Sequence, residues 1–400
     1  MMYINNDRIA PKLDQSTFGI GGKIELDTAY WNSFKAKVAY YQTSDLGLRS
    51  SDPKKTDAYM FDVNKVPYRT LGEAVLEYKD DRFVLLFGRQ PIDTPIVSTY
   101  DYRIIPNLFE AYTLTVAATP YTQITLSYIS KMSGLDGLVS FKNFKSMSQQ
   151  TYTSLAMVDM QKVDSNDGDT IDISRLSGNE GVIMSGIVYD NDIKIQGWNY
   201  YCQDVVDEFY TDIAFPSTMT TGIVSTFGVQ AYGVRDVGHF KDFLHTLGLN
   251  GSYELYGIKL SLENKKIGVA TYVAYNFFTG DSQTVTAFGN WGGYPEYVTV
   301  PYMFAQDDAV SAIAKSQMGK INFKFDLSYV GLPQQTLITG YSYIDLHETI
   351  MPNSDIAVVN LVYKVNISDA LWFKAQYEWR DSNNYRYAND MLTLSATYTF

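Results

Sequence analysis

Apolar and polar residues alternate strictly along many short stretches of this chain. The last nine residues, LTLSATYTF (392–400), set apolar side chains from Leu392 to Phe400 against four hydroxylated ones, and KINFKFD (320–326) alternates in the same way. A period of two places apolar side chains on one face of a β-strand and polar side chains on the other. The pattern therefore predicts an all-β protein whose strands have one apolar and one polar face.

The alternating stretches are numerous, and the connections between them follow a rhythm of their own. Every second connection is short, as at 79–81 and 263–266, whereas those in between are mostly long, as at 132–180 and 278–315. We therefore predict a transmembrane antiparallel β-barrel of about 18 strands, with short periplasmic turns and long extracellular loops. The predicted strands are 1–7, 18–29, 34–43, 68–78, 82–89, 109–117, 123–131, 181–189, 193–201, 207–214, 223–233, 252–262, 267–277, 316–326, 337–345, 355–365, 371–381 and 391–400, all within a single barrel domain over 1–400.

Composition agrees with membrane-spanning strands and not with membrane-spanning helices. Aromatic residues make up 15% of the chain and charged residues 19%, and the second value lies below the roughly 25% of a typical soluble domain. The sequence has no apolar run of the roughly 18 or more residues that a helical span requires. A soluble β-sandwich or β-helix is the alternative, but a sandwich would need a second sheet to cover each apolar face.

The charge balance and the chain ends bear on location and partners. A formal net charge of −12 argues against a nucleic-acid partner, because phosphate contacts require a basic surface. The opening MMYINNDRIAPK lacks the apolar core of a signal peptide, so we expect an N-terminus that has been trimmed. The terminal Phe400 looks like the sorting signal of bacterial outer-membrane proteins. We expect a multi-pass barrel of the bacterial outer membrane, in contact with outer-membrane lipid and lipopolysaccharide, as a monomer or a homotrimer.

Patterns typical of enzymes and cofactor sites are weak or absent. The sequence contains no Gly-x-Ser-x-Gly nucleophile motif, and GIGGK (19–23) departs from the phosphate-loop pattern. We therefore expect no enzymatic activity and no cofactor. One stretch, DSNDGDTID (164–172), is rich enough in carboxylates to be a calcium candidate, although a solvated acidic loop is the favoured interpretation. Its candidate ligands are Asp164, Asp167, Asp169 and Asp172.

The stretch FGRQPIDTPIVSTYDYRIIPNLFEAYTL (87–114) is the richest in the chain. Pro91, Pro95 and Pro106 stiffen the connection within it and discourage its pairing into a sheet. A stiff, aromatic connection that carries both signs of charge is suited to a fixed constriction inside a lumen. The residues that we expect at the constriction are Asp93, Tyr100, Asp101, Tyr102 and Arg103.

At these residues the chain resembles the OprD family of bacterial outer-membrane porins, including the Opr-type porins of epsilonproteobacteria. The resemblance is carried by Gly88, by the spaced Pro91 and Pro95, by DYRIIP (101–106), and by the early hairpin GGKIELDTA (21–29) with FKAKVAYYQTSDLG (34–47). It implies an eighteen-stranded barrel whose third and seventh loops, here 90–108 and 278–315, fold into the lumen.

The resemblance also implies a ladder of basic residues that guides small carboxylate-bearing solutes through the pore. In this chain such a ladder would be mostly lysine, which lacks the planar fork with which arginine grips a carboxylate. Its members would be Lys23, Lys35, Lys37, Arg69, Lys320, Lys324, Lys374 and Arg380. The first functional hypothesis is a passive diffusion channel for ions and small hydrophilic solutes, including small carboxylates or amino acids. The second is a structural or adhesive surface barrel with an occluded lumen.

Overall fold

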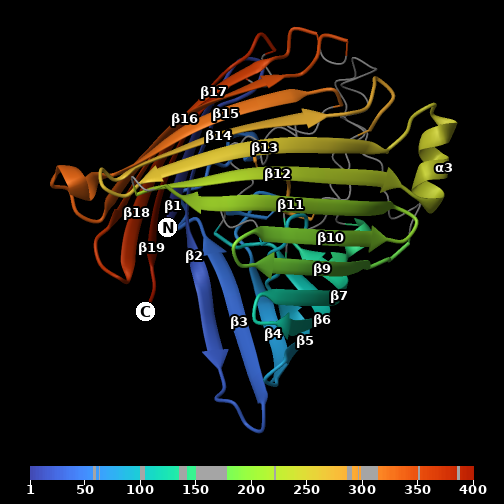
Figure 1. Cartoon of the computed structure of the whole chain (residues 1–400). Helices are drawn as coiled ribbons and strands as arrows, with labels where there is room; N and C mark the ends of the chain where they lie inside the picture. Colours follow the sequence, from blue (N-terminus) through green and yellow to red (C-terminus); the bar gives the residue numbers. More distant parts are fainter. Residues whose placement is uncertain are drawn as a thin grey trace.

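Strands that pair with their neighbours along the chain build a wall that closes on itself (Figure 1). This computed structural model describes residues 1–56, 60–62, 64–99, 104–134, 142–149, 178–219, 222–285, 291–295, 297–298, 314–349, 352–384 and 388–400. All but the two-residue β8 of its nineteen strands form the wall, and every pairing is antiparallel. The predicted eighteen-stranded antiparallel barrel is confirmed.

The wall strands match the alternating stretches of the sequence closely. They are β1 (Met2–Arg8), β2 (Gln15–Asp27), β3 (Phe34–Ser44), β4 (Arg69–Lys79), β5 (Phe83–Gln90), β6 (Leu108–Thr119), β7 (Thr122–Ser133), β9 (Val182–Asp190), β10 (Lys194–Cys202), β11 (Val206–Thr218), β12 (Ile223–Asp236), β13 (Tyr253–Asn264), β14 (Val269–Phe278), β15 (Gln317–Asp326), β16 (Gln335–Asp345), β17 (Ile356–Asn366), β18 (Leu371–Asp381) and β19 (Asn389–Tyr398).

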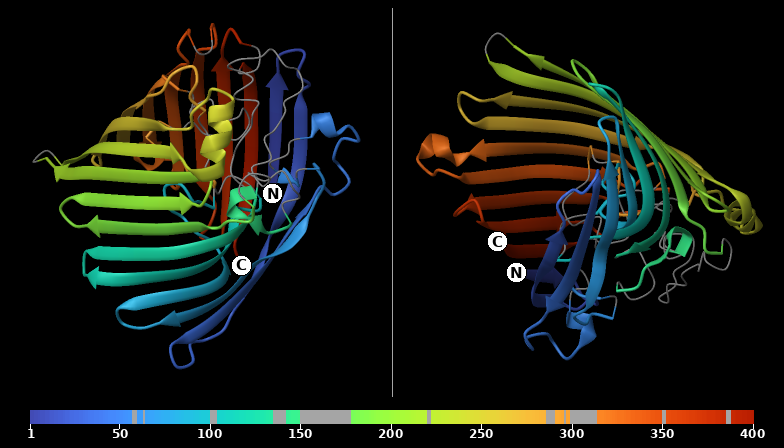
Figure 2. Two further views of the ribbon diagram at one scale, coloured as in Figure 1. Left: turned by 90° about the vertical axis from the view of Figure 1, so that its right-hand side faces the viewer. Right: turned by 90° about the horizontal axis from the view of Figure 1, so that it is seen from below.

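The barrel closes where the last strand meets the first. β1 pairs with both β2 and β19, so that Met2 lies opposite Gly19 on one side and Ser395 on the other. The amino group of Met1 also donates to the backbone oxygen of Ala396 at 2.7 Å. The two chain ends therefore lie side by side (Figure 2).

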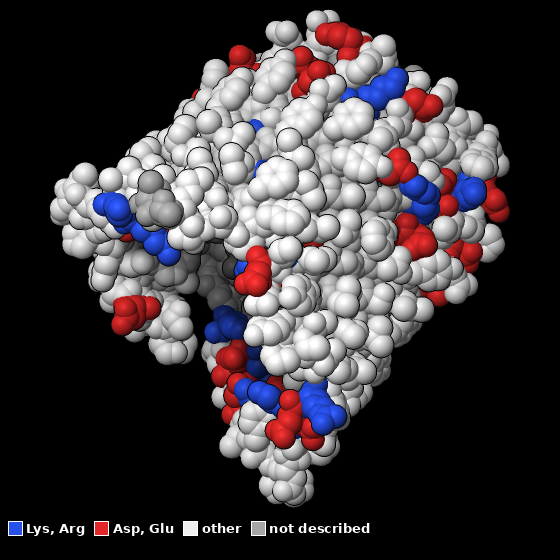
Figure 3. All heavy atoms as spheres, viewed as in Figure 1, with Lys and Arg blue, Asp and Glu red and all other residues white. Residues whose placement is uncertain are grey.

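The two faces of the wall differ in the way that the alternation predicts. Large apolar side chains such as Leu126, Ile258 and Phe323 are exposed on the outward face. Asn322, the neighbour of Phe323, points the opposite way and packs over Gly340 inside the barrel. A broad outer band of the molecule accordingly shows few charged atoms, and most charged groups lie at its edges (Figure 3). An apolar exterior around a polar interior is the arrangement of a barrel that faces lipid.

The connections at one end of the barrel have eight residues or fewer, whereas the other end carries all the long loops and also the short connections 9–14, 203–205 and 382–388. The end called here the short-turn end carries the connections 28–33, 80–82, 120–121, 191–193, 219–222, 265–268, 327–334 and 367–370. The opposite, long-loop end carries 9–14, 45–68, 91–107, 134–181, 203–205, 237–252, 279–316, 346–355 and 382–388.

Within the described residues, helical structure lies in these connections. The α-helix α3 (Gly238–Thr246) lies at the long-loop end, on the right in Figure 1. Three short 3-10 helices are also present: η1 (Pro53–Lys55), η3 (Met147–Gln149) and η5 (Leu327–Val330). No helix in the described part of the chain is long and apolar enough to cross a membrane.

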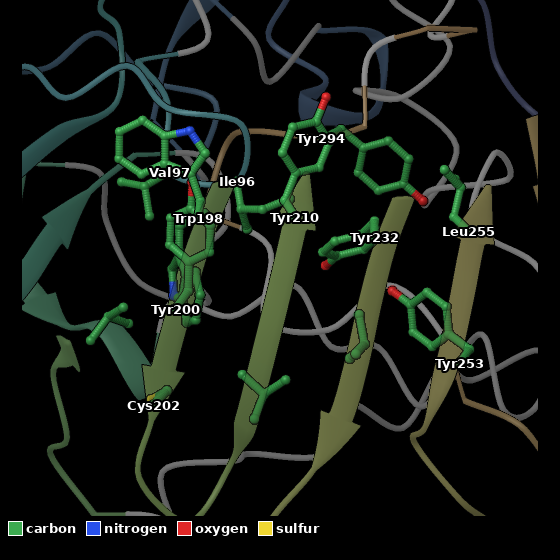
Figure 4. Close-up of a cluster of buried hydrophobic side chains, with 14 of the residues drawn as sticks. Ile96, Val97, Trp198, Tyr200, Cys202, Tyr210, Tyr232, Tyr253, Leu255 and Tyr294 are labelled. Atoms are coloured by element: carbon green, nitrogen blue, oxygen red, sulfur yellow. The ribbon is translucent and has the colours of Figure 1, made fainter. Parts of the chain in front are cut away.

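The third loop (91–107) and the seventh loop (279–316) fold into the barrel. Ile96 and Val97 of the third loop pack with Trp291 and Tyr294 of the seventh loop in one buried cluster. The same cluster includes inward-facing wall residues such as Tyr200, as Figure 4 shows. The core of this protein therefore lies inside the barrel, between the two loops and the wall.

A glycine is required near the end of β5, where the wall packs closely. Gly88 has a φ of +117°, and a Cβ there would lie 2.2 Å from the backbone oxygen of Ala74. Residues with a side chain rarely adopt this backbone conformation. Gly88 therefore allows β5 to pair closely with β4 just before the third loop begins.

Candidate functional site in the barrel lumen

Three loops are fastened together inside the barrel. The backbone N–H of Ser98 donates to the oxygen of Trp291 at 3.1 Å, and the N–H groups of Trp291 and Gly293 donate to the oxygen of Ile96 at 3.2 and 3.0 Å. The indole N–H of the fully buried Trp291 donates to the backbone oxygen of Met147 at 2.9 Å. The third, fourth (134–181) and seventh loops therefore form a single clasp around Trp291.

Asp93 is the one predicted constriction residue within the described part of the chain. Its Oδ1 accepts hydrogen bonds from the backbone N–H of Thr99 at 2.9 Å, from the Thr99 hydroxyl at 2.7 Å and from the Ser98 hydroxyl at 3.1 Å. These contacts fix the shape of the third loop, so Asp93 has a positioning role. The other predicted constriction residues, Tyr100, Asp101, Tyr102 and Arg103, lie outside the described residues.

A cavity of about 750 Å³ separates the clasp from the wall. Its lining combines amide, hydroxyl and aromatic side chains with few charged ones, and includes Gln90, Asp93, Thr94, Ser98, Thr113, Gln123, Thr125, Gln196, Trp198, Tyr210, Asp212, Lys259, Tyr272, Tyr294 and Tyr297. Such a lining can hydrogen-bond to a small hydrophilic solute from several sides.

The charged pair of this cavity consists of Lys259 on β13 and Asp212 on β11. The Lys259 Nζ lies 3.7 Å from Asp212 Oδ2 and 4.0 Å from the centre of the Tyr297 ring. The Tyr297 hydroxyl donates to the same carboxylate at 2.5 Å. Burial, and next the hydrogen bond to Asp212, raises the pKa of the Tyr297 phenol, which therefore remains a donor. The pair joins the seventh loop to the wall and places both signs of charge at the cavity.

On β2 and β3 the structure places Lys23, Lys35 and Lys37 inside the lumen, each beside a carboxylate. Lys37 lies 2.6 Å from Glu73 on β4 and 3.4 Å from Glu25, while Lys23 lies 3.2 Å from Glu73 and also pairs with Glu25. Lys35 pairs with Asp27 at 2.6 Å. This part of the wall is a charge-balanced network and not a row of free cations.

Glu73 is the centre of this network. Its side chain is 1% exposed, and its Oε1 accepts a hydrogen bond from the Tyr41 hydroxyl at 2.5 Å. Sequence alternation alone could not identify it, because a β-bulge at Gly72 interrupts the periodicity of β4.

The same bulge moves Arg69 out of the predicted ladder. Arg69 pairs with Gln42, and Leu71 pairs with the outward-facing Tyr40, whereas Glu73 pairs with Ala39 on the inner face. The extra residue at Gly72 reverses the alternation. Arg69 therefore lies on the outward face at the long-loop end, and its assignment to the lumen is corrected.

The remaining predicted ladder residues lie on the inner face of β15 and β18. Lys320 pairs with the buried Ser342, Lys324 shares its face with Asn322, and Lys374 shares its face with the buried Gln376. Arg380 and Glu378 form a fully buried ion pair at 2.6 Å. The register also places Lys364, which the sequence prediction omitted, opposite Lys374 on β17.

The predicted basic ladder omits the lumen-facing Lys259 and Lys364, although the alternation of apolar and polar residues contains a signal for both. Lys259 alternates with the exposed Ile258 and Leu260, which marks it as inward-facing. Lys364 follows the inward-facing apolar Val362, and this residue obscures the polar periodicity of β17.

The calcium candidates Asp164, Asp167, Asp169 and Asp172 lie outside the described residues. Within the described residues, no group of His, Cys, Asp or Glu side chains could hold a metal ion.

The network around Glu73 gives a testable expectation about ion selectivity. Replacing Glu73 by Gln should raise the ratio of anion to cation permeability by about two- to fivefold. The reason is that a unit charge about 4 Å from an ion in water interacts with it by about 1 kcal/mol. Reversal potentials under a salt gradient measure this ratio. The control Glu254→Gln removes the same charge from the outward face, where Glu254 pairs with Arg235, and should leave the ratio unchanged. An equal shift in both variants would contradict the lumenal assignment.

Comparisons with known proteins agree on the architecture. No family model matches the sequence, and no curated protein matches it significantly. Among solved structures, Acinetobacter baumannii OccAB2 is similar with a TM-score of 0.77 and 14% identity, covering 100% of this chain and 96% of that one. Pseudomonas aeruginosa OccK9 (OpdG) gives a TM-score of 0.75 and 14% identity over 99% and 96% of the two chains. Pseudomonas aeruginosa OpdK with vanillate gives a TM-score of 0.74 and 11% identity over 99% and 95%.

These comparisons define the class of fold. This chain shares its closed eighteen-stranded barrel fold with these solved structures, which are OprD/Occ-family porins. The resemblance seen in the sequence is thereby confirmed for the fold.

Proposed function

We propose that this protein is a porin of the bacterial outer membrane, a passive diffusion channel for ions and small hydrophilic solutes. The observation that carries the proposal is the clasp of loops inside the barrel, which leaves a polar cavity of about 750 Å³ against the wall. A clasp in the lumen narrows a water-filled path, and the polar groups at the narrowing set its selectivity. In this arrangement the short-turn end faces the periplasm and the long-loop end faces the outside.

Small carboxylates and amino acids are the solutes that we propose. Lys320, Lys324, Lys364 and Lys374 provide positive charge on the inner face of β15, β17 and β18. The pair of Lys259 and Asp212 provides one site of each sign, which suits a solute that carries both an ammonium and a carboxylate group. OpdK, which has the same fold, was solved with vanillate.

Conductance across a planar lipid bilayer tests the channel directly. The purified protein should insert and produce stepwise open-channel currents. A pure protein that inserts and passes no ions would overturn the proposal and favour the structural or adhesive barrel with an occluded lumen. Uptake of glycine and acetate into liposomes containing the protein, compared with uptake of a neutral solute of similar size, would then test the proposed solute class.

The charged pair of the cavity should determine part of the selectivity. Lys259→Met leaves the Asp212 carboxylate without its ammonium partner and should shift the permeability ratio toward cations by about two- to fivefold. Asp212→Asn should shift the ratio toward anions by a similar factor, because Lys259 then remains unbalanced. Reversal potentials measure both changes, and shifts in the same direction would contradict the assigned roles.

A further inference from the structure

A carboxyl side chain that the proposed function does not use is fully buried on the inner face of the wall. Glu208 lies on β11, opposite Tyr200 of β10 and Val234 of β12, and has no exposed surface. Its Oε1 accepts a hydrogen bond from the Tyr232 hydroxyl at 3.1 Å, whereas its Oε2 has no hydrogen-bond partner. A buried carboxyl with a single hydrogen bond is unusual, because buried polar groups are normally satisfied.

Other buried carboxylates of this barrel have a cationic partner. Glu73 lies 2.6 Å from the Lys37 ammonium, and Glu378 lies 2.6 Å from the Arg380 guanidinium. Within the described residues, no Lys, Arg or His forms an ion pair with Glu208. Glu208 therefore differs from them in having no counter-charge.

The surroundings of Glu208 are neutral or acidic. The nearest charged groups are Asp207, which follows it on the outward face, and Asp204 and Glu180 near Cys202. The titratable side chains that face Glu208 from β10, or that surround the Tyr232 hydroxyl from β12, β13 and the seventh loop, are Tyr200, Cys202, Tyr232, Tyr253 and Tyr294. None of these groups offers a positive charge to a carboxylate.

The side chains over Glu208 connect it to the clasp. Tyr200 and Tyr232 belong to the same buried cluster as Ile96 of the third loop and Tyr294 of the seventh loop. In Figure 4 the two wall tyrosines project from β10 and β12 into the region where these loop residues lie. Because Glu208 has no exposed surface beneath this cluster, water reaches it from the lumen when the clasp moves away from the wall.

This burial gives the two charge states of Glu208 different effects on the clasp. An ionised carboxylate held away from water without a counter-charge costs far more free energy than a neutral carboxyl. When the clasp is open, water solvates the carboxylate, and an exposed glutamate ionises above about pH 4.3. The closed clasp therefore favours the protonated side chain, the open clasp favours the carboxylate, and a rise in pH favours opening.

We propose that Glu208 is a pH-sensitive latch of the clasp. The clasp stays closed over the neutral carboxyl, and it loosens when the carboxyl releases its proton to water. This inference goes beyond the proposed channel function, because the latch regulates how often the path through the lumen is wide.

Hydrogen–deuterium exchange of the purified barrel in detergent, followed by mass spectrometry from about pH 5 to about pH 9, tests the proposal over the range in which buried glutamates titrate. The reporter is the backbone N–H of Ser98, which donates to the Trp291 oxygen in the closed clasp. After correction for the intrinsic pH dependence of exchange, the ratio of open to closed clasp should rise by up to about tenfold per pH unit, because opening releases one proton.

Glu208→Gln keeps the size of the side chain and removes the proton that titrates, so its corrected exchange should not depend on pH. The matched control Glu254→Gln removes a carboxylate from the outward face, where it pairs with Arg235, and should keep the slope of the unmodified protein. Heat-modifiable migration on gels checks that each variant is folded. If Glu208→Gln fails to fold, Glu208→Met fills the same space with an uncharged chain and provides the same test.

Two results would overturn the latch: corrected exchange that is independent of pH in the unmodified protein, or the same slope in the unmodified protein and in Glu208→Gln. Single-channel currents separate the latch from the channel function. With both correct, the currents of the unmodified protein become larger and noisier as the pH rises, and those of Glu208→Gln do not. A pH-dependent exchange that Glu208→Gln abolishes, in a protein that passes no current, would support the latch and remove the channel.

Discussion

Leu126→Arg should destabilise the barrel by about 2–4 kcal/mol, because it places a charged group on the lipid-facing surface of a membrane strand. Leu126 lies in β7 and is 51% exposed on the outward face, where it pairs with Leu114. The free energy of unfolding in lipid vesicles, measured by denaturant titration, provides the test.

The neighbouring residue on the same strand is the matched control. Thr125 points into the lumenal cavity of about 750 Å³, which has room for a solvated arginine. Thr125→Arg should therefore cost much less than Leu126→Arg, although it should lower the conductance by adding bulk to the path. Equal costs for both variants would mean that β7 does not separate lipid from a water-filled lumen.

Trp291→Ala should loosen the clasp of the third, fourth and seventh loops and raise the single-channel conductance. Trp291 is fully buried, and its side chain donates to the Met147 backbone oxygen. Truncation of a buried tryptophan costs about 3–5 kcal/mol, and here the loss should appear chiefly as loop opening because the wall strands pair independently of the clasp. We expect larger and noisier open-channel currents than those of the unmodified protein.

Trp379→Ala is the control for this prediction. Trp379 is an outward-facing residue of β18 with 42% of its surface exposed, so its truncation leaves the clasp intact. The control should keep the conductance of the unmodified protein. If the two variants have the same conductance, the clasp does not limit the current.

The wall could be predicted from the sequence because the local alternation of apolar and polar residues identifies each strand. The alternation of Phe323 with Asn322 and Lys324 specifies a strand and its two faces without knowledge of any partner. Strand number, the division into short and long connections, and the direction of the inward lysines of β2, β3, β15 and β18 all follow from such local patterns. The proline-rich stretch before β6 likewise indicated the third loop through its composition.

The charge balance of the lumen could not be predicted in this way. Lys37 and Glu73 are far apart in sequence and meet because β3 and β4 pair in one particular register. The bulge at Gly72 then reverses the direction of Arg69, and no local pattern reveals it. The lysines of β2 and β3, predicted as part of a basic ladder, are therefore paired with carboxylates in one network, and Arg69 lies on the outward face.

The apolar exterior and polar interior of the barrel wall follow from local sequence, because side-chain direction along a strand depends only on a period of two. The contents of the interior depend on contacts made by the complete fold. The contacts of Trp291 with Ile96 and Met147, and those of Lys259 with Asp212 and Tyr297, join segments that are remote in the chain. Such contacts depend on closure of the wall and on docking of the loops within it, and these are properties of the whole fold.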